Sequence, residues 1–339
     1  MKQILPTLVL TMYLIFFFVG FNSSESIQKT IDSKNVSYRL AEGWPLMSPT
    51  FKLGNPTGIG IDSNGDVIIF HRANRIWTEP MPKDLIDRNT VVKLDPKTGQ
   101  IKEEWGSNLF VMPHGLEVDK DDNVWVTDVG LHQVMKFDKH GNLLLTLGEP
   151  GVNGSDALHF DMPTDVAVAS DGSFYVSDGY GNSRVMMFSS EGDFLMEWGT
   201  EGEMEGEFIT PHGVDLDNEG NVYVADRENN RIQKFNKEGG FLRSWKNPDA
   251  KQLYALAFDT FNQTLFAIDF DFTDQDQGWK IHGSDIMGFS SDLEPKIKFG
   301  RTGNYQGPVT RYHDIAVDPE GNIYVGDILG NKVQKFIKE

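Results

Sequence analysis

Short stretches of alternating apolar and polar residues recur along the chain from about residue 50, and they predict β-strands rather than helices. Each recurring unit has an apolar strand, an Asp-rich turn with glycine, a second strand and a terminal Asp. Six units align, at 56–71, 113–128, 163–178, 211–226, 253–269 and 312–327. Their first residues lie 57, 50, 48, 42 and 59 residues apart, a spacing that favours propeller repeats with long loops.

The fourth unit shows how each repeat supplies four strands. Period-two alternation continues beyond Asp226 into 231–235 and 241–245, and four antiparallel strands make one blade. Glycines such as Gly172 and Gly220 supply the positive φ angles that tight hairpins need. We therefore expect an all-β fold, a six-bladed β-propeller.

The sixth unit ends at Glu339 after only three strands. A ring of complete blades needs a fourth strand there, and the alternating segment Val36–Leu40 is the candidate. We expect this N-terminal strand to close blade six. The predicted organisation is then an N-terminal segment at 23–50 that includes the closing strand, followed by the propeller at 51–339.

The first 22 residues differ from the rest of the chain. Ile4 to Phe21 is an uncharged, largely apolar run of 18 residues that follows Lys2 and precedes a polar stretch. This arrangement predicts a signal peptide at 1–22 and hence a secreted, periplasmic or extracellular protein. An uncleaved membrane anchor is the alternative, because 18 residues is near the lower limit for spanning a bilayer.

Composition narrows the function. The 339 residues include 31 basic and 50 acidic side chains, a formal charge of −19, which argues against nucleic acid as a partner. Cysteine is absent, which excludes disulfides, thiolate metal sites and cysteine nucleophiles. The 34 glycines fit a turn-rich β protein.

Three histidines occupy the same repeat position, at the start of the innermost strand of units two, four and six. They are His114, His212 and His313. Alternate blades of a six-bladed ring lie a third of a turn apart, so these imidazoles should converge on the channel. Three imidazoles with a fourth position left open are the arrangement expected of a catalytic zinc. The alternative for each histidine is a turn cap, which does not explain their strict alternation.

The residues that follow the second strand should lie on the same face as the histidines. Arg72, Tyr180 and Arg227 occupy these positions in units one, three and four. Two cations beside a metal suggest a bound carboxylate. The alternatives are an ion pair between Arg227 and Glu228 and simple packing of the Tyr180 ring.

The remaining repeat positions are expected to be structural. The terminal aspartates should accept backbone N–H bonds within turns, and they are Asp128, Asp178, Asp226, Asp269 and Asp327, with His71 replacing the Asp of unit one. We interpret His132, His140 and His282 as surface or loop residues.

Five segments in order resemble one known family. They are His71–Trp77, Pro113–Leu116, Asp178–Arg184, Ala225–Asn229 and His313–Ile315. The repeat resembles the NHL class of propeller, and the five segments together are similar to peptidyl-α-hydroxyglycine α-amidating lyase. The likeness runs from about residue 50 to the C-terminus.

This resemblance implies an activity and roles for residues. The family cleaves a peptide ending in α-hydroxyglycine into a peptide amide and glyoxylate. By resemblance, the three histidines hold zinc, Tyr180 is the base that removes the hydroxyl proton, and Arg72 and Arg227 orient the substrate. The resemblance also implies a structural calcium bound by the Asp314 carboxylate and the backbone carbonyls of Ile59 and Leu116, a set of oxygen ligands that suits this ion.

The chain departs from the family pattern in several ways. The two disulfides of the animal enzymes are missing, and their positions hold Asp161, Gly181, Tyr223 and Lys234. Arg311–Tyr312 replaces the family's Met-Pro before the third histidine, which places an extra cation beside the site. No copper monooxygenase domain is visible, so either a separate monooxygenase supplies the hydroxyglycine substrate or the natural substrate differs. We expect a monomer.

Two other function classes fit parts of the pattern. A non-catalytic NHL propeller that binds ligands on its rim explains the six units but not the alternating histidines. A calcium-dependent lactonase-like hydrolase predicts an all-oxygen metal cage in the channel, whereas the repeat position there carries histidines.

Overall fold

The computed structural model describes residues 36–48, 50–273, 278, 280–302 and 307–339. These residues form 25 β-strands and contain no α-helix. The predicted signal peptide at 1–22 lies outside the described residues, so secretion stays a prediction. Within the part that is described, no helix is long and apolar enough to span a membrane.

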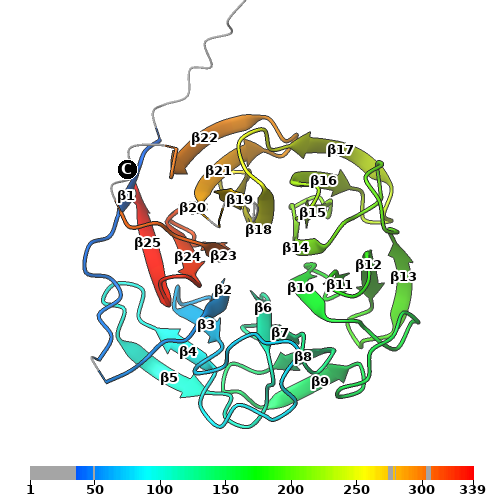
Figure 1. The fold of residues 1–339 in the computed structure, drawn as a ribbon, viewed down its shortest axis with the longest axis horizontal. Helices are drawn as coiled ribbons and strands as arrows, with labels where there is room; N and C mark the ends of the chain where they lie inside the picture. Colours follow the sequence, from blue (N-terminus) through cyan, green and yellow to red (C-terminus); the bar gives the residue numbers. More distant parts are fainter. Residues whose placement is uncertain (1–35, 49, 274–277, 279, 303–306) are drawn as a thin grey trace, which may run out of the picture. The chain divides into compact units, whose positions relative to one another are not determined.

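The strands form six sheets arranged as blades around a central channel (Figure 1), as predicted. In the first four blades the strands follow one another outward in chain order. Blade one has β2 (Pro56–Ile61), β3 (Val67–His71), β4 (Val91–Leu94) and β5 (Ile101–Trp105); blade two has β6 (Pro113–Val118), β7 (Val124–Asp128), β8 (Gln133–Phe137) and β9 (Leu143–Leu147). Blade three has β10 (Pro163–Val168), β11 (Phe174–Asp178), β12 (Arg184–Phe188) and β13 (Phe194–Trp198); blade four has β14 (Pro211–Leu216), β15 (Val222–Asp226), β16 (Arg231–Phe235) and β17 (Phe241–Lys246).

Blade five is the largest. It consists of β18 (Gln252–Asp259), β19 (Thr264–Thr273), β21 (Asp285–Ser290) and β22 (Pro295–Gly300), and β20 (Lys280–Gly283) pairs with the far end of β19. The sequence repeat of this blade ends at Asp269, but β19 continues to Thr273 and so extends beyond the four-stranded sheet.

Blade six joins the two ends of the described chain. β23 (Tyr312–Val317), β24 (Ile323–Asp327) and β25 (Lys332–Lys338) are completed by β1 (Tyr38–Leu40), which pairs antiparallel with β25. The predicted closing strand is therefore confirmed, although it is shorter than Val36–Leu40. An ion pair of 3.0 Å between Arg39 and Glu339 lies beside this closure.

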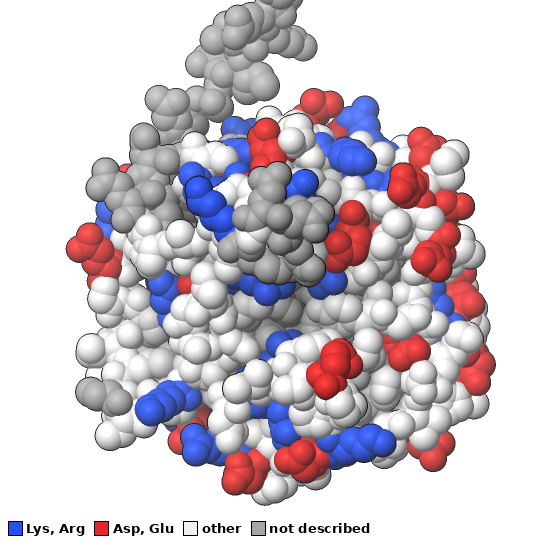
Figure 2. Space-filling view, viewed as in Figure 1, with Lys and Arg blue, Asp and Glu red and all other residues white. Residues whose placement is uncertain are grey.

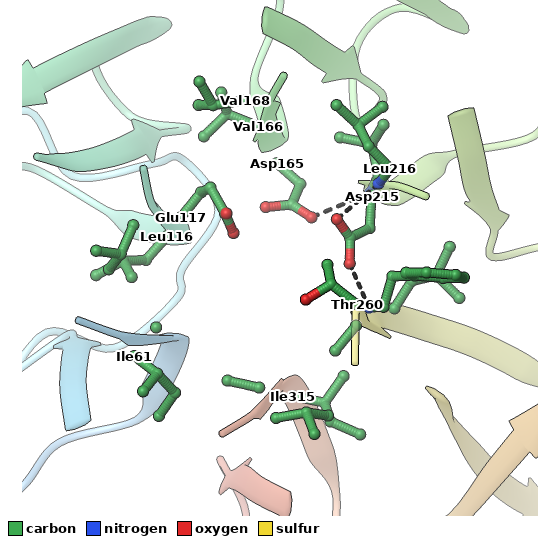
Figure 3. A pocket seen from close by; sticks show the side chains of 18 of the residues that line it. Ile61, Leu116, Glu117, Asp165, Val166, Val168, Asp215, Leu216, Thr260 and Ile315 are labelled. Atoms are coloured by element: carbon green, nitrogen blue, oxygen red, sulfur yellow. Dashed lines mark hydrogen bonds between the residues drawn. The ribbon is translucent and has the colours of Figure 1, made fainter. Parts of the chain in front are cut away.

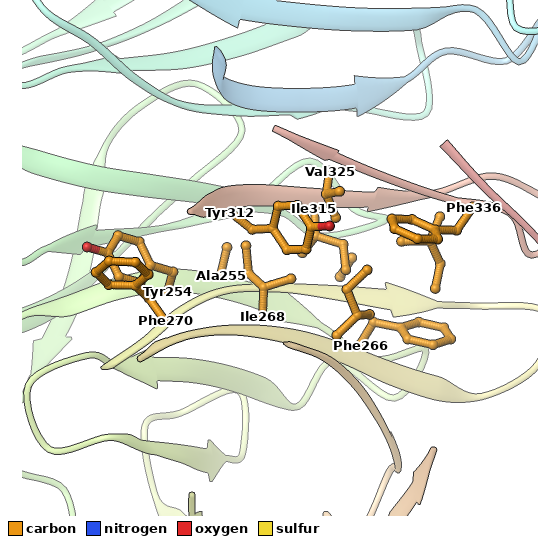
Figure 4. Packing of buried hydrophobic residues seen from close by; sticks show 12 residues of the cluster. Tyr254, Ala255, Phe266, Ile268, Phe270, Tyr312, Ile315, Val325 and Phe336 are labelled. Atoms are coloured by element: carbon orange, nitrogen blue, oxygen red, sulfur yellow. The ribbon is translucent and has the colours of Figure 1, made fainter. Parts of the chain in front are cut away.

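Apolar side chains fill the seams between neighbouring blades. Figure 4 shows the seam between blades five and six, where Phe266 and Ile268 of β19 lie with Ile315 of β23 and Val325 of β24. Leu265 and Ala267, which alternate with these residues along β19, pack toward blade four instead. Both faces of β19, the second strand of blade five, are thus buried. Burial of apolar area at each seam supplies the main stabilisation of the ring.

The innermost strands share a local irregularity. In all six blades the register between the first and second strands shifts near the start of the inner strand, after its first residue in five blades and after its second residue, Leu253, in blade five. A β-bulge bends a strand and re-aims a side chain. The positions at the bulges are Thr57, His114, Thr164, His212, Tyr254 and His313.

Candidate metal centre and active site

The three histidines at the bulges of blades two, four and six meet at one end of the channel, as their alternation predicts. The centroid of the His114 ring lies 4.8 Å from that of His212 and 4.6 Å from that of His313, and the last two are 5.0 Å apart. All three are buried, and one ring nitrogen from each lies within 4.8 Å of the others. This is a geometry in which one ion can bind three imidazoles.

Each imidazole is held by the adjoining blade in the same way. The Nδ1 atoms of His114, His212 and His313 lie 2.6, 2.9 and 2.9 Å from the backbone oxygens of Thr164, Tyr254 and Thr57. A carbonyl oxygen only accepts, so each Nδ1 carries the hydrogen and each Nε2 keeps its lone pair. The acceptors are themselves at the bulge positions of the adjoining blades, so the bulges orient the three ligands.

The electrostatics favour neutral imidazoles. Burial lowers the pKa of each histidine well below its usual value, and neighbouring guanidinium groups lower it further. Arg72 acts on the pKa of His114 and His313, and Arg227 on that of His114 and His212. Neutral imidazole is the form that binds metal, so these residues fit a divalent metal ion.

Tyr180 lies against this cluster. Its hydroxyl oxygen is 3.1 Å from the Nε2 of His114 and 3.2 Å from the Nε2 of His212, and it accepts a 3.0 Å hydrogen bond from Nη1 of Arg227. The preceding Gly179 makes this position possible. A Cβ atom there would lie 1.9 Å from the backbone oxygen of Pro211, so only glycine lets the loop pass so close to blade four.

The two predicted arginines, Arg72 and Arg227, also lie at this cluster. Arg227 forms an ion pair with Glu228 at 2.8 Å and also donates a hydrogen bond to Tyr180. The alternative predicted for Arg227, an ion pair with Glu228, therefore occurs together with its contact to the site. Burial alone would lower the pKa of Arg227, but Tyr180, Tyr254 and Glu228 outweigh it and raise that pKa.

Arg72 is buried beside the same cluster. Its Nε donates to the backbone oxygen of Pro113 at 3.0 Å, and burial lowers its pKa to about 10. The guanidinium lies 5.4 Å from the Trp77 ring centroid, and that ring lies 5.5 Å from the ring of Tyr180. Figure 2 shows basic side chains at the border of the central hollow on the face in view.

Sequence reasoning gave no role to two aromatic residues of the site. Trp77 stands in the long loop of blade one, where no periodicity indicated a contact with Tyr180. Tyr254 stands at the bulge of blade five, a repeat position that carries no histidine. Its position in the repeat was the available signal, since its ring lies 4.9 Å from that of His212.

The repeated aspartates are structural, as predicted. Asp128 accepts backbone hydrogen bonds from four residues of the adjoining turns, which are Val111, Met112, Gly130 and Leu131. His71 takes the same place in blade one, where its Nδ1 accepts from the backbone N–H groups of Gly54 and Ala73. Among the other histidines, His282 lies on strand β20 rather than in a loop and bonds Asp271 at 2.6 Å.

The opposite half of the channel holds carboxylates. A cavity of about 480 Å³ is lined by Glu117, Asp165, Asp215 and Asp314 together with Ile59 and Leu116 (Figure 3). The predicted calcium ligands thus share one cavity, and the Ile59 amide donates to the Asp314 carboxylate at 2.6 Å. The other three carboxylates were not predicted, because each occurs in only one or two of the six units.

Burial raises the pKa of all four acids. The pKa rises to about 8 for Asp165 and about 7 for Asp215, and it lies well above the usual value for Glu117 and Asp314. The neighbouring carboxylates add to the rise. Such a group of acids fits a cation, which would stabilise the ionised forms.

The fold and the site define a class of protein, a β-propeller with three alternating channel histidines. The NHL repeat family matches residues 110–137, 160–188 and 208–235. The virginiamycin B lyase of Staphylococcus aureus has a similar fold, with a TM-score of 0.56 and 16% identity, and the match covers 88% of this chain and 85% of that one.

Relatives of known name identify the family more narrowly than the repeat and the fold do. The chain is 33% identical over 325 residues to peptidyl-α-hydroxyglycine α-amidating lyase 2 of Drosophila melanogaster, covering 88% of this chain and 75% of the relative. It is 37% identical over 320 residues to the peptidylglycine α-amidating monooxygenase of Rattus norvegicus, covering 84% of this chain and 30% of the relative. The chain spans about a third of the length of the monooxygenases that it matches. It belongs to the peptidyl-α-hydroxyglycine α-amidating lyase family.

The buried His71 generates a prediction on stability and pH. Burial lowers its pKa to about 4 from 6.5, so the stability that depends on neutral His71 is present above pH 6.5 and is lost as the pH falls through 4. In His71→Asn the amide oxygen accepts from the same backbone donors without taking up a proton. We expect the variant to lose about 3 kcal/mol less than the parent in free energy of unfolding between pH 6.5 and 4.

Denaturant titrations at both pH values measure this difference. His140→Asn is the matched control, because the His140 side chain is 63% exposed. Equal losses in the parent and in His71→Asn would contradict the assignment.

Proposed function

We propose that this protein cleaves peptides ending in α-hydroxyglycine into a peptide amide and glyoxylate. The observation that carries the proposal is the position of the Tyr180 hydroxyl, which lies against the Nε2 atoms of two of three convergent imidazoles and accepts from Arg227. Membership of the lyase family supports the same reaction. A purely ligand-binding propeller gives no reason for a phenol at that point.

The histidine cluster is proposed to hold zinc. His114, His212 and His313 supply three neutral nitrogen donors, which is the number typical of a catalytic zinc site. When bound, zinc supplies Lewis-acid polarisation of substrate oxygen atoms. The protein's part is to keep the three Nε2 lone pairs directed inward through the Nδ1 bonds to the backbone.

The proposed reaction needs a base and no redox step. Tyr180, as phenolate, takes the proton from the α-hydroxyl group, the carbon–oxygen double bond of glyoxylate forms, and the carbon–nitrogen bond breaks with its electron pair on nitrogen. The proton then passes to that nitrogen and gives the amide, so the atoms balance without water. Arg227 donates to the Tyr180 oxygen and stabilises the negative charge on it.

The substrate carboxylate is proposed to bind the arginines. Arg72 and Arg227 both act electrostatically on the imidazole cluster, and guanidinium groups recognise carboxylates through paired hydrogen bonds. Trp77 lies against Arg72 and restricts the orientation of its guanidinium. A monooxygenase that hydroxylates C-terminal glycine is the proposed source of the substrate, and the monomeric state remains a prediction.

The carboxylate cavity is proposed to hold a structural calcium. Asp314 would bind it with the carbonyl groups of Ile59 and Leu116, and Asp165 and Glu117 line the same cavity. The shared cavity and the buried acidic charge support this proposal. A lactonase-like hydrolase is less well supported, because the phenol and the guanidinium groups lie at the imidazole end.

Replacing Tyr180 by Phe tests the base. We expect Tyr180→Phe to lower kcat for glyoxylate release from α-hydroxyhippurate by about 10²-fold or more, because the proton acceptor is lost. Zinc content and the unfolding midpoint should not change. Tyr175→Phe removes a phenol oxygen from strand β11 that bonds Lys237 instead, and it should keep full activity. A Tyr180→Phe enzyme with parental kcat would remove Tyr180 from the mechanism.

Replacing His212 by Ala tests the metal centre. We expect zinc bound per chain, measured by elemental analysis after dialysis, to fall from about one to near zero because two nitrogen donors cannot hold the ion tightly. Activity should fall with it. His140→Ala, at an exposed turn, serves as the control. Full activity in a zinc-free His212→Ala protein would contradict a zinc mechanism.

Replacing Asp314 by Asn tests the calcium site. Calcium at a hundred times its Kd should stabilise the parent by about 2.7 kcal/mol, and we expect Asp314→Asn to lose most of this gain. Thermal unfolding with calcium and with chelator measures it. The exposed Asp121→Asn is the matched control, and an undiminished calcium effect in Asp314→Asn would refute the site.

A further inference from the structure

A second phenol–guanidinium pair lies beside the imidazole cluster. Tyr254 occupies, in blade five, the bulge position that holds histidine in blades two, four and six, and its ring lies 4.9 Å from His212 and 5.7 Å from His313. Its hydroxyl accepts a 2.5 Å hydrogen bond from Nη2 of Arg311 and donates to Gln252 at 3.1 Å. The pair Tyr254–Arg311 thus stands beside the pair Tyr180–Arg227.

The Arg311 side chain is held firmly in this place. Its backbone N–H donates to the Asp327 carboxylate at 2.9 Å, and its backbone oxygen accepts from Ile328 at 3.0 Å. The guanidinium carbon lies 4.7 Å from the ring centroid of Phe270 and 5.6 Å from that of Tyr254. A guanidinium packed against two rings keeps its direction and loses little freedom when it binds a ligand.

Arg311 nevertheless lacks an acidic partner among the described residues. Its Nε is buried and has no hydrogen-bond partner in the part of the chain that the structure describes. Arg227 is paired with Glu228 at 2.8 Å, and Arg301, which is also largely buried, with Asp269 at 3.0 Å. The Nε of Arg301 is also unpartnered, so the difference is the carboxylate. A half-buried guanidinium without a carboxylate partner is costly in the free protein, and a ligand that supplies one removes that cost.

The number of cations exceeds what the proposed substrate group needs. Arg72 and Arg227 suffice for the single carboxylate of hydroxyglycine, and Arg311 is a third guanidinium at the same cluster. Tyr254 lies between Arg227 and Arg311, with its ring centroid 5.4 and 5.6 Å from their guanidinium carbons. Both guanidinium groups thus contact one ring, and an extended peptide advances by only about 3.3 to 3.6 Å per residue. A substrate whose carboxylate binds Arg227 can therefore bring the side chain of its preceding residue near Arg311.

We propose that Arg311 is a specificity-determining residue that binds an acidic side chain on the residue immediately before hydroxyglycine. The protein then prefers peptides ending in Glu or Asp followed by α-hydroxyglycine. This inference rests on the proposed lyase function.

The test compares two substrates that differ only in charge. Zinc-loaded full-length protein is assayed for glyoxylate release from N-acetyl-Glu-α-hydroxyglycine and N-acetyl-Gln-α-hydroxyglycine. We expect kcat/KM to be about tenfold or more higher for the Glu substrate, as a charge-assisted hydrogen bond provides. In Arg311→Met the ratio should fall to near one, and Arg311→Lys should restore part of it by restoring the charge.

The ratio separates recognition from structural damage. A variant that only disturbs the packing of Tyr254 lowers kcat/KM for both substrates in proportion and leaves the ratio unchanged, which would overturn the proposal. A ratio near one in the parent would also overturn it while leaving the lyase function intact. Release of no glyoxylate from either substrate would reject both. Arg243→Met, at a half-exposed position on the outer strand β17, is the control for long-range charge and should keep the parental ratio.

Discussion

The site depends on the hydrogen bond between an imidazole Nδ1 and a backbone oxygen of the adjoining blade. A bulge at the start of each inner strand frees one side chain from the sheet, and in three blades that side chain is histidine. The same bond fixes the tautomer, directs Nε2 inward and links two blades. The orientation of the three imidazoles and these contacts between neighbouring blades therefore rest on one set of hydrogen bonds.

The backbone hydrogen bonds of the repeat are similar from blade to blade, whereas the side chains near the three histidines differ. The terminal aspartate of each blade accepts backbone N–H groups from adjoining turns, and His71 does the same with a neutral ring nitrogen. These hydrogen bonds hold the loops that follow the second strands. Arg72, Tyr180 and Arg227 therefore occupy equivalent places on the channel face although their side chains differ in chemistry. Six similar units thus produce one asymmetric site.

The fold could be predicted from the sequence because its signals are local and repeated. Strand alternation, glycine turns and the missing fourth strand of the last unit indicated six blades and the closing segment near Leu40. The convergence of His114, His212 and His313 followed from their equal position in alternate units. Contacts that depend on a single unit could not be predicted. Trp77 reaches Tyr180 from an irregular loop, and Asp165 and Glu117 meet only because their blades adjoin in the ring.

The two halves of the channel differ in their ionisable groups, with guanidinium groups beside the imidazoles and four carboxyl groups of raised pKa beyond them. An anion that approaches the imidazole end is attracted by these guanidinium groups. The imidazole end is therefore the end of the channel that favours acidic molecules. In the proposed reaction the product glyoxylate is itself an anion, so it would compete with incoming substrate for the same arginines.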